Sequence, residues 1–293
     1  MRTGTDCLAC FMQQALNVTK LCTEDAQMQR QLLVEVGAML GTFPENSTPP
    51  ENAAHYYRLI AESTKVADPF AEIKKQSNDF ALSLENRIND TIQQAPDPLL
   101  TALRFAIGAN VLDNGAQRQL DIQDTLAQCQ QQQFAIDHYS WLREKLATSR
   151  KVLLLADNCG EIVFDKLLVQ QLLAMGLDVV VAVRGMPIIN DATLEDALYC
   201  GLDKICRVVA NGSDLPGTSL EQCTAEFRDL FAGADCILSK GMGNFECLSE
   251  SNAPIVFLFT VKCSTVLHHL QGLYSSALLQ VGSPVIVAPS AVV

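Results

Sequence analysis

The pattern that most restricts the fold of this chain begins at Lys151. From there onward, short apolar runs alternate with stretches in which apolar residues recur every three or four positions. Such alternation is typical of βαβ units, in which helices cover both faces of a mainly parallel sheet. The expected strands are 152–156, 179–183, 205–210, 236–238, 255–259 and 285–288, and the helical stretches include 166–175, 193–200 and 220–231. We therefore predict a three-layer α/β/α domain over residues 149–293.

The first half of the chain has helical periodicity and repeated helix-start signals. Asp68-Pro69 and Asp97-Pro98 each combine a side chain that accepts from free backbone amides with a proline suited to the first helical turn. Thr48-Pro49-Pro50 is a similar start. These signals predict six or seven helices and little or no sheet, so residues 1–148 are expected to form a mainly helical domain.

Charge and hydropathy exclude several classes of partner. The net charge of −12 divides evenly, with 12 Lys and Arg against 18 Asp and Glu in residues 1–148 and 9 against 15 afterwards. No basic face is indicated, so nucleic acid and anionic membranes are not expected partners. The first residues lack the apolar core of a signal peptide, and no apolar run approaches the length of a membrane span. We expect a cytoplasmic protein.

Polar clusters follow three of the predicted strands. They are Asp157-Asn158, the segment 184–191 and the segment 239–246. Because the carboxyl ends of parallel strands lie at one edge of a sheet, these loops are expected to converge. Asp157, Asn158 and Asp191 would then offer two carboxylates and an amide oxygen, the donors that Mg²⁺ or Mn²⁺ prefers. An ordinary alternative remains open, in which Asn158 caps the helix that follows it and Asn190 or Asp191 caps the helix that starts near Thr193.

The third loop, Lys240-Gly241-Met242-Gly243-Asn244-Phe245-Glu246, combines a cation with two glycines after a strand. Backbone amides and a lysine in such a loop can bind a phosphate, although the loop matches neither the Walker A motif nor GxGxxG. The alternative is a tight turn with Lys240 in solvent. Acidic metal ligands facing a phosphate cradle predict phosphoryl chemistry. Because an Asp-x-Asp pair is missing after the first strand, attack by metal-activated water is favoured over an aspartyl-phosphate intermediate.

The cysteines raise a separate question. Eleven cysteines, an odd number scattered along a long chain, are typical of free thiols rather than of a disulfide framework. Cys7 and Cys10 form a single CxxC motif, and Cys263 follows a predicted strand. Without a second CxxC a four-thiolate zinc site is not supported. A redox pair, a three-thiolate metal site and buried free thiols all remain open.

These motifs together resemble a known family. The N-terminal CxxC, DNCGEIVFD at 157–165, PIINDATLEDA at 187–197, KGMGNFE at 240–246 and VKC at 261–263 are similar to the metal-dependent damage-control phosphatases, formerly domain-of-unknown-function family eighty-nine. The CxxC motif resembles the small prokaryotic-type branch. The resemblance implies a helical domain joined to a Rossmann-like domain, and a phosphatase that acts on sugar phosphates or damaged cofactor intermediates with Mg, Mn, Co or Ni.

The resemblance also implies roles for individual residues. Asp157, Asn158 and Asp191 would be the metal ligands, and Lys240 would bind phosphate. The substrate would lie near the glycines and polar side chains of the loops, namely Gly241, Gly243, Asn244, Glu246 and Lys262. The family's Gly-Asn-x-x-Asp element corresponds to residues 109–113, which begin with Ala here and would bring Asn110 to the site.

The expected function is therefore metal-dependent hydrolysis of phosphate monoesters, with a small phosphorylated metabolite as the partner and the oligomeric state left open. Two alternatives from other classes remain. One is an S-adenosylmethionine-dependent carboxyl methyltransferase, which would need a glycine-rich loop after the first strand, where this chain has only Gly160. The other is a non-catalytic metabolite-binding protein with a structural metal.

Overall fold

A computed structural model describes residues 1–117, 122–276 and 278–289, without the side chains of residues 109–125. At its centre is a seven-stranded sheet with the strand order β1-β7-β6-β5-β2-β3-β4. Neighbouring strands are parallel except β7, which runs antiparallel to β6. The mainly parallel α/β fold expected from the sequence is confirmed. The strands are β1 (Ile136–Asp137), β2 (Lys151–Leu155), β3 (Asp178–Val183), β4 (Arg207–Ala210), β5 (Cys236–Lys240), β6 (Ile255–Thr260) and β7 (Pro284–Val287).

Residues 1–148 contain seven helices in the part that the structure describes, as expected. They are α1 (Thr5–Cys22), α2 (Ala26–Leu40), α3 (Pro49–Thr64), α4 (Ala71–Gln94), α5 (Pro98–Gln117), α6 (Ile122–Gln131) and α7 (Tyr139–Thr148). Thr48 and Glu51 close a capping box at the start of α3, and the Asp97 carboxylate accepts from the Leu100 amide at the start of α5. The short strand β1, which the sequence pattern did not predict, also lies in this half.

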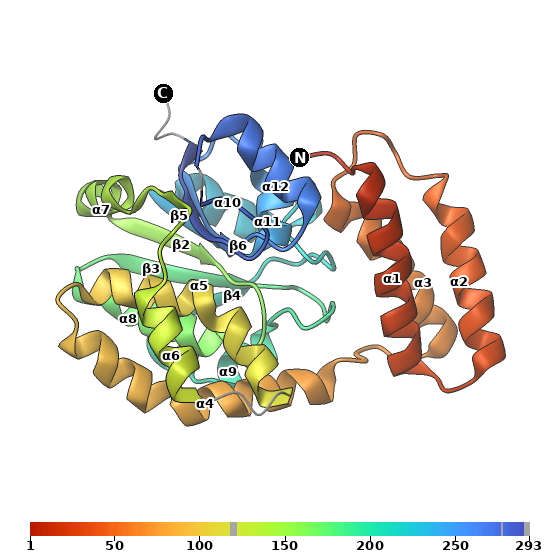
Figure 1. Ribbon diagram of the computed structural model, residues 1–293, viewed down its shortest axis with the longest axis horizontal. Coiled ribbons are helices and arrows are strands. Elements are labelled where there is room, and N and C mark those ends of the chain that lie inside the picture. Colours follow the sequence, from red (N-terminus) through yellow and green to blue (C-terminus); the bar gives the residue numbers. More distant parts are fainter. Residues whose placement is uncertain (118–121, 277, 290–293) are drawn as a thin grey trace.

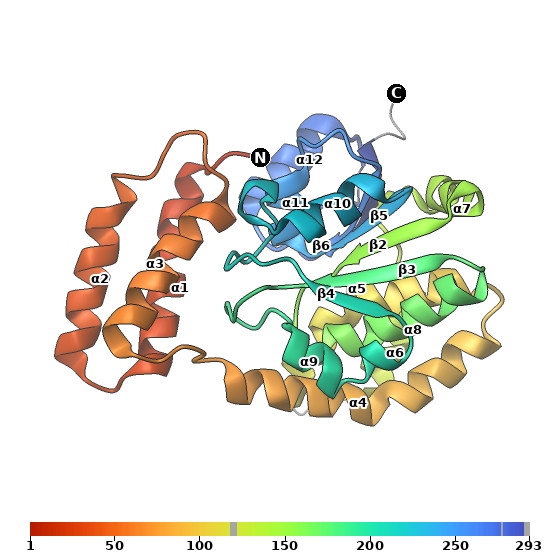
Figure 2. The same cartoon turned by 180° about the vertical axis from the view of Figure 1, so that it is seen from behind.

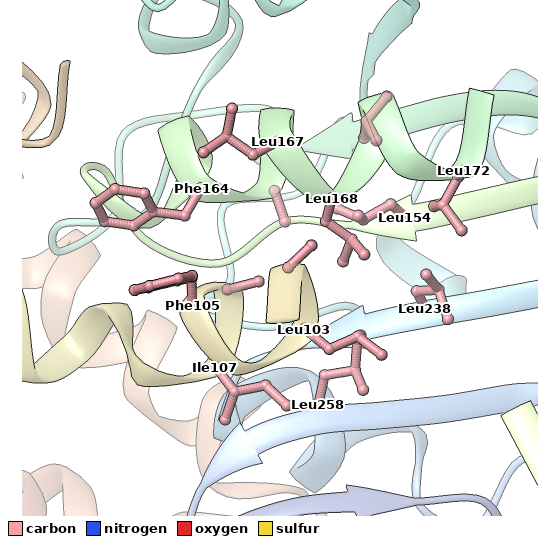
Figure 3. Packing of buried hydrophobic residues seen from close by; sticks show 14 of the residues in the cluster. Leu103, Phe105, Ile107, Leu154, Phe164, Leu167, Leu168, Leu172, Leu238 and Leu258 are labelled. Carbon is pink, nitrogen blue, oxygen red and sulfur yellow. The ribbon is translucent and has the colours of Figure 1, made fainter. Parts of the chain in front are cut away.

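Helices cover both faces of the sheet (Figure 1). Between the strands of the second half run α8 (Glu161–Ala174), α9 (Leu194–Tyr199), α10 (Ala225–Gly233), α11 (Met242–Leu248) and α12 (Ser264–Leu273). On one face, Leu103, Phe105 and Ile107 of α5 pack against Phe164 and Leu168 of α8 and against the strands, as Figure 3 shows. On the other face, a second cluster joins the strands to α10, α11 and α12. The core therefore draws α5 from the first half onto the sheet, and α4 packs against α5 and α8.

The first three helices form a separate lobe beside the sheet (Figures 1 and 2). Its apolar cluster includes Phe11, Val36, Tyr56 and Ile60, and Ile188 from the loop after β3 joins it. The lobe contacts the rest of the chain through α1 with α12 and through α3 with α11. The division at residue 148 stays a prediction, and the lobe α1–α3 is the part that faces the strand ends. No helix in the described residues is long and apolar enough to cross a membrane.

Candidate functional site

A cavity of about 300 Å³ lies between the lobe α1–α3 and the carboxyl ends of the central strands. The loops after β2, β3 and β6 contribute Asp157, Asn158, Asp191 and Lys262 to its polar floor, and α11 contributes Glu246. The lobe contributes the opposite wall, which consists of Asp6, Cys7, Cys10, Phe11, Gln14, Pro49, Pro50, Ala53 and Tyr57. The structure thus brings together most of the side chains that the sequence singled out, and adds a wall from α1 and α3.

The loops after β2 and β3 are joined by their backbones. The Ala192 amide donates to the Asp157 carbonyl at 2.8 Å, and the Cys159 amide donates to the Asn190 carbonyl at 2.8 Å. Asn158 and Asp191 form an isolated β-bridge. The predicted convergence of these loops is therefore confirmed, and it fixes Asp157 and Asp191 side by side.

The structure contradicts the alternative in which Asn158 and Asp191 are helix caps. The N-cap of α8 is Gly160, with φ 78° and no side-chain cap bond. The cap of α9 is Thr193, whose amide and hydroxyl both donate to Asp196. The side chains of Asn158 and Asp191 therefore cap neither α8 nor α9, and they can serve as oxygen donors at the strand ends.

Arg184, at the end of β3, is a site residue that the sequence reasoning missed. It is 2 % exposed, and its Nε donates to Asp191 Oδ2 at 2.5 Å. Its Nη2 lies 3.5 Å from Asp157 Oδ1, while its Nη1 donates to Thr218 and Asn244. One buried guanidinium therefore orients both carboxylates. Arg184 could have been found from the sequence, because it directly follows a predicted strand and begins one of the three polar segments.

The charges of Arg184 and Lys262 do not fully offset the effect of burial on the two carboxylates. Burial, with the neighbouring charges of Asp191 and Glu161, raises the pKa of Asp157 to about 7. Burial also raises the pKa of Asp191, although Arg184 opposes that shift. Closely spaced buried carboxylates with raised pKa values are a common feature of functional sites, because a bound cation relieves their repulsion.

The Asn158 amide is oriented by acidic neighbours. Its Nδ2 donates to Asp157 Oδ2 and to Glu161 Oε1, each at 3.0 Å. Because both N–H groups face carboxylates, the carbonyl oxygen is turned away from them and is left to bind a cation. The amide therefore adds a third oxygen donor beside Asp157 and Asp191.

Lys240 lies behind this amide rather than in the cavity wall. Its ammonium, 1 % exposed, is 3.1 Å from Glu161 Oε2 and 2.8 Å from Asp165 Oδ1. Burial alone would lower the pKa of Lys240, but the two carboxylates raise it. The alternative of a solvent-exposed lysine is wrong. Its expected contact with phosphate stays a prediction. In this structure Lys240 donates to Glu161, and Glu161 accepts from the Asn158 amide.

Close packing explains why positions 241 and 243 of the third loop are glycine. Gly241 has φ 80° and ψ 158°, and a Cβ there would lie 2.1 Å from the Asp157 carboxyl carbon. Its amide donates to the Leu258 carbonyl at 3.1 Å, so it is already engaged. A Cβ on Gly243 would lie 2.0 Å from the Pro216 carbonyl oxygen. Their predicted role in binding substrate stays a prediction, and only Gly243 lines the cavity.

Of the other predicted substrate residues, two line the cavity and one is buried behind it. Asn244 is fully buried and donates to the carbonyls of Ala156 and Lys240, so it links neighbouring strand ends. Glu246 and Lys262 line the cavity. The side chain of Asn110 lies outside the described residues, so its expected place at the site stays a prediction.

The three thiols that the sequence singled out meet in the same cavity. Cys7 and Cys10, on α1, and Cys263, at the start of α12, all line it. Cys10 Sγ accepts from Gln14 Nε2 at 3.3 Å, and the hydroxyls of Tyr56 and Tyr57 hold the other end of that amide. Burial raises the pKa of all three thiols. In the structure all eleven cysteines are unpaired.

The donor set at the strand ends fits a hard divalent cation. It consists of two buried carboxylates whose repulsion such an ion relieves, together with an amide oxygen, so water and substrate oxygens would complete the shell.

Within the described residues no group of three or more His, Cys, Asp and Glu side chains is arranged to hold a metal. The three-thiolate metal site is therefore not supported.

Comparison with known proteins identifies the relatives of this chain. Residues 3–276 match the damage-control phosphatase ARMT1-like domain. The chain is 33% identical over 276 residues to a damage-control phosphatase of Archaeoglobus fulgidus, covering 91% of this chain and 94% of that protein. It is 30% identical over 277 residues, 90% of each chain, to an uncharacterized protein of Methanocaldococcus jannaschii.

The likeness extends to three dimensions. The fold superimposes on the crystal structure of a DUF89 family protein from Pyrococcus horikoshii with a TM-score of 0.88 and 28% identity, over 98% of this chain and 99% of that one. The family resemblance carried by the sequence motifs is confirmed, while the branch suggested by the CxxC motif stays a prediction. The chain belongs to the damage-control phosphatase ARMT1-like domain family.

Proposed function

We propose that this protein is a divalent-metal-dependent phosphatase that hydrolyses phosphate monoesters of small metabolites, such as sugar phosphates or damaged cofactor intermediates. The observation that carries the proposal is the cluster of Asp157, Asn158 and Asp191 on the floor of a small cavity that Lys262 also lines. Relatives that match over nine-tenths of the chain are named damage-control phosphatases, which supports the same activity.

The three oxygen donors would hold the metal, with Mg²⁺, Mn²⁺, Co²⁺ or Ni²⁺ as candidates. When bound, such an ion would neutralise phosphate oxygens and lower the pKa of a water molecule to make it a nucleophile. Arg184 keeps one oxygen of Asp191 occupied, so it fixes which edge of that carboxylate faces the cavity. The Lys262 ammonium would bind a phosphate oxygen, and this geometry favours it over Lys240 for that role.

The lobe α1–α3 would enclose the rest of the substrate. Phe11, Pro49, Pro50 and Ala53 form an apolar part of the wall, and Tyr57 and Gln14 add polar groups that hold one another. A wall of this kind excludes bulk water from the scissile ester, which strengthens the charge interactions at the floor.

The proposal is tested with p-nitrophenyl phosphate and each of the four metal ions, before and after EDTA. Asp157→Ala should abolish turnover while the protein stays folded by circular dichroism, whereas Asp203→Asn, an exposed carboxylate outside the cavity, should leave turnover unchanged. Full activity in Asp157→Ala would overturn the proposal. Binding of S-adenosylmethionine in a calorimetric titration, without any phosphatase activity, would favour the methyltransferase alternative instead.

A further inference from the structure

Glu246, on α11, places a carboxylate in the cavity that the proposed chemistry does not use. The residue is 8 % exposed and lines the cavity. Within the described part of the chain its carboxylate makes no hydrogen bond or ion pair, and only its backbone carbonyl is engaged, by the Met1 amine at 2.7 Å. Burial raises the pKa of Glu246 to about 7, and the charge of the Met1 ammonium opposes that shift. A buried carboxylate without a partner is costly to keep ionised, so its position points to a ligand that compensates it.

The charge of Glu246 acts on a different set of side chains from the metal ligands. The charges that act on Asp157 come from Asp191, Glu161, Lys262 and Arg184. Glu246 instead adds to the effect of burial in raising the pKa values of three thiols, those of Cys7, Cys10 and Cys263. We call this the thiol end of the cavity.

The Asp6 carboxylate lies at the thiol end as well. Its charge adds to the effect of burial on the pKa of Cys7, and its Oδ2 accepts from the Ser264 hydroxyl at 2.9 Å. Asp6 and Glu246 therefore give the thiol end two carboxylates, contributed by α1 of the lobe and by α11 of the α/β body.

The charges of the two ends can be compared. At the floor, Arg184 and Lys262 offset Asp157 and Asp191, and a divalent cation would offset a phosphate dianion. At the thiol end the Met1 ammonium is the positive charge that acts on Glu246, and it also pairs with Glu250 at 3.6 Å. Among the described residues that line the cavity, Lys262 is the sole Lys, Arg or His, so the lining leaves Asp6 and Glu246 with an excess of negative charge. Asp6 is exposed and Glu246 is buried. A second anionic group on the substrate would therefore be repelled there and an ammonium group attracted, most strongly by Glu246, because burial strengthens the interaction of charges.

We propose that the thiol end binds an ammonium group on the alcohol portion of the substrate, so that the preferred substrates are phosphate monoesters of amino sugars or amino alcohols. This inference rests on the proposed phosphatase function and names its substrate class. Glu246 accepts the charged hydrogen bond, and Asp6 contributes the second negative charge. The cavity volume of about 300 Å³ restricts these substrates to small molecules.

The test compares three esters that differ in one substituent: glucosamine 6-phosphate, glucose 6-phosphate and N-acetylglucosamine 6-phosphate. With the metal that supports turnover, kcat/KM should be about tenfold or more higher for the amine than for the hydroxyl or the acetamide. Glu246→Gln keeps the shape but removes the charge, so it should lower the ratio of amine to hydroxyl by about tenfold to a hundredfold. Glu226→Gln, an exposed carboxylate on α10, is the matched control and should keep the ratio.

Inhibition gives an independent readout, because free glucosamine should inhibit more strongly than free glucose and should lose that advantage in Glu246→Gln. Equal kcat/KM for the three esters, or an unchanged ratio in Glu246→Gln, would overturn the inference and leave the phosphatase function intact. If Glu246→Gln does not fold, the wild-type comparison and the inhibition by the free sugars decide the question. If the wild type hydrolyses no ester with any metal, the proposed function fails and the inference fails with it.

Discussion

Replacing Gly241 by alanine tests the claim that the third loop exists to accommodate Asp157. Gly241 joins β5 to α11 with φ 80° and ψ 158°, a region of backbone space that is essentially restricted to glycine. The added Cβ would lie 2.1 Å from both Cγ and Oδ2 of Asp157, where ordinary contacts begin at 3.4 Å. The loop or the carboxylate must therefore move by more than an ångström.

The magnitude follows from two separate costs. Holding a non-glycine residue in that backbone region costs about 1–3 kcal/mol. Overpacking against a carboxylate already fixed by Arg184 and Asn158 adds about 1–3 kcal/mol. We expect Gly241→Ala to lower the free energy of unfolding by about 2–6 kcal/mol, and to weaken the binding of Mn²⁺ by about tenfold to a hundredfold because the ligand is displaced.

Urea denaturation and calorimetric titration with Mn²⁺ measure the two effects. Gly272→Ala is the matched control, because Gly272 lies in α12 and a Cβ there meets no atom within 4 Å. It should lose no stability and should gain up to about 1 kcal/mol. If Gly241→Ala matches Gly272→Ala in both stability and metal affinity, the packing argument is refuted.

Three further predictions concern charge. Lys240→Met leaves Glu161 and Asp165 buried without their cation, so urea denaturation should show a loss of about 3–5 kcal/mol; a loss below 1 kcal/mol would contradict it. Burial raises the pKa of Asp157 to about 7, so the metal-free folded protein keeps a proton that the unfolded chain releases above about pH 4. Its unfolding free energy should fall as pH rises from 4 to 7, and thermal melts in EDTA should show a smaller fall for Asp157→Asn. Lys262→Met should weaken competitive inhibition by inorganic phosphate by about tenfold, and an unchanged inhibition constant would return that role to Lys240.

The strand ends were the part of the site that the sequence could predict. Apolar runs bounded by turn residues fix where strands lie, and parallel βαβ connections bring their carboxyl ends to one edge. Asp157 and Asp191 could therefore be placed together without any knowledge of strand order. Asn158 was harder, because its spacing to Glu161 fits a capping box equally well. In the structure the same two side chains do meet, but through a bond that orients the amide and caps nothing.

Other parts of the site depend on tertiary packing that periodicity does not encode. For the segment 240–246 the sequence left open a phosphate-binding loop and a tight turn before a helix, and in the structure α11 begins at Met242 with Asn244 and Phe245 buried. Arg184 and Lys240 both follow strands, but which carboxylates they contact depends on side-chain direction across neighbouring strands. The wall formed by α1 and α3 could not be assigned either, since nothing in a helical pattern says which face meets a distant loop.

The buried cations show how the site is held before any ligand is bound. Arg184, from β3, fixes the two carboxylates of the floor, and Lys240, from β5, fixes Glu161 and through it the amide of Asn158. Each oxygen donor is thus oriented, among the described residues, by a charge from a neighbouring strand and not by a side chain of the lobe α1–α3, although Ile188 of the loop that carries Asp191 packs in the apolar cluster of the lobe. Metal affinity should therefore respond to changes at Arg184 and Lys240, whereas choice among substrates should respond to changes in the lobe and at Glu246. A change in the lobe that altered metal affinity and left substrate preference untouched would contradict this division.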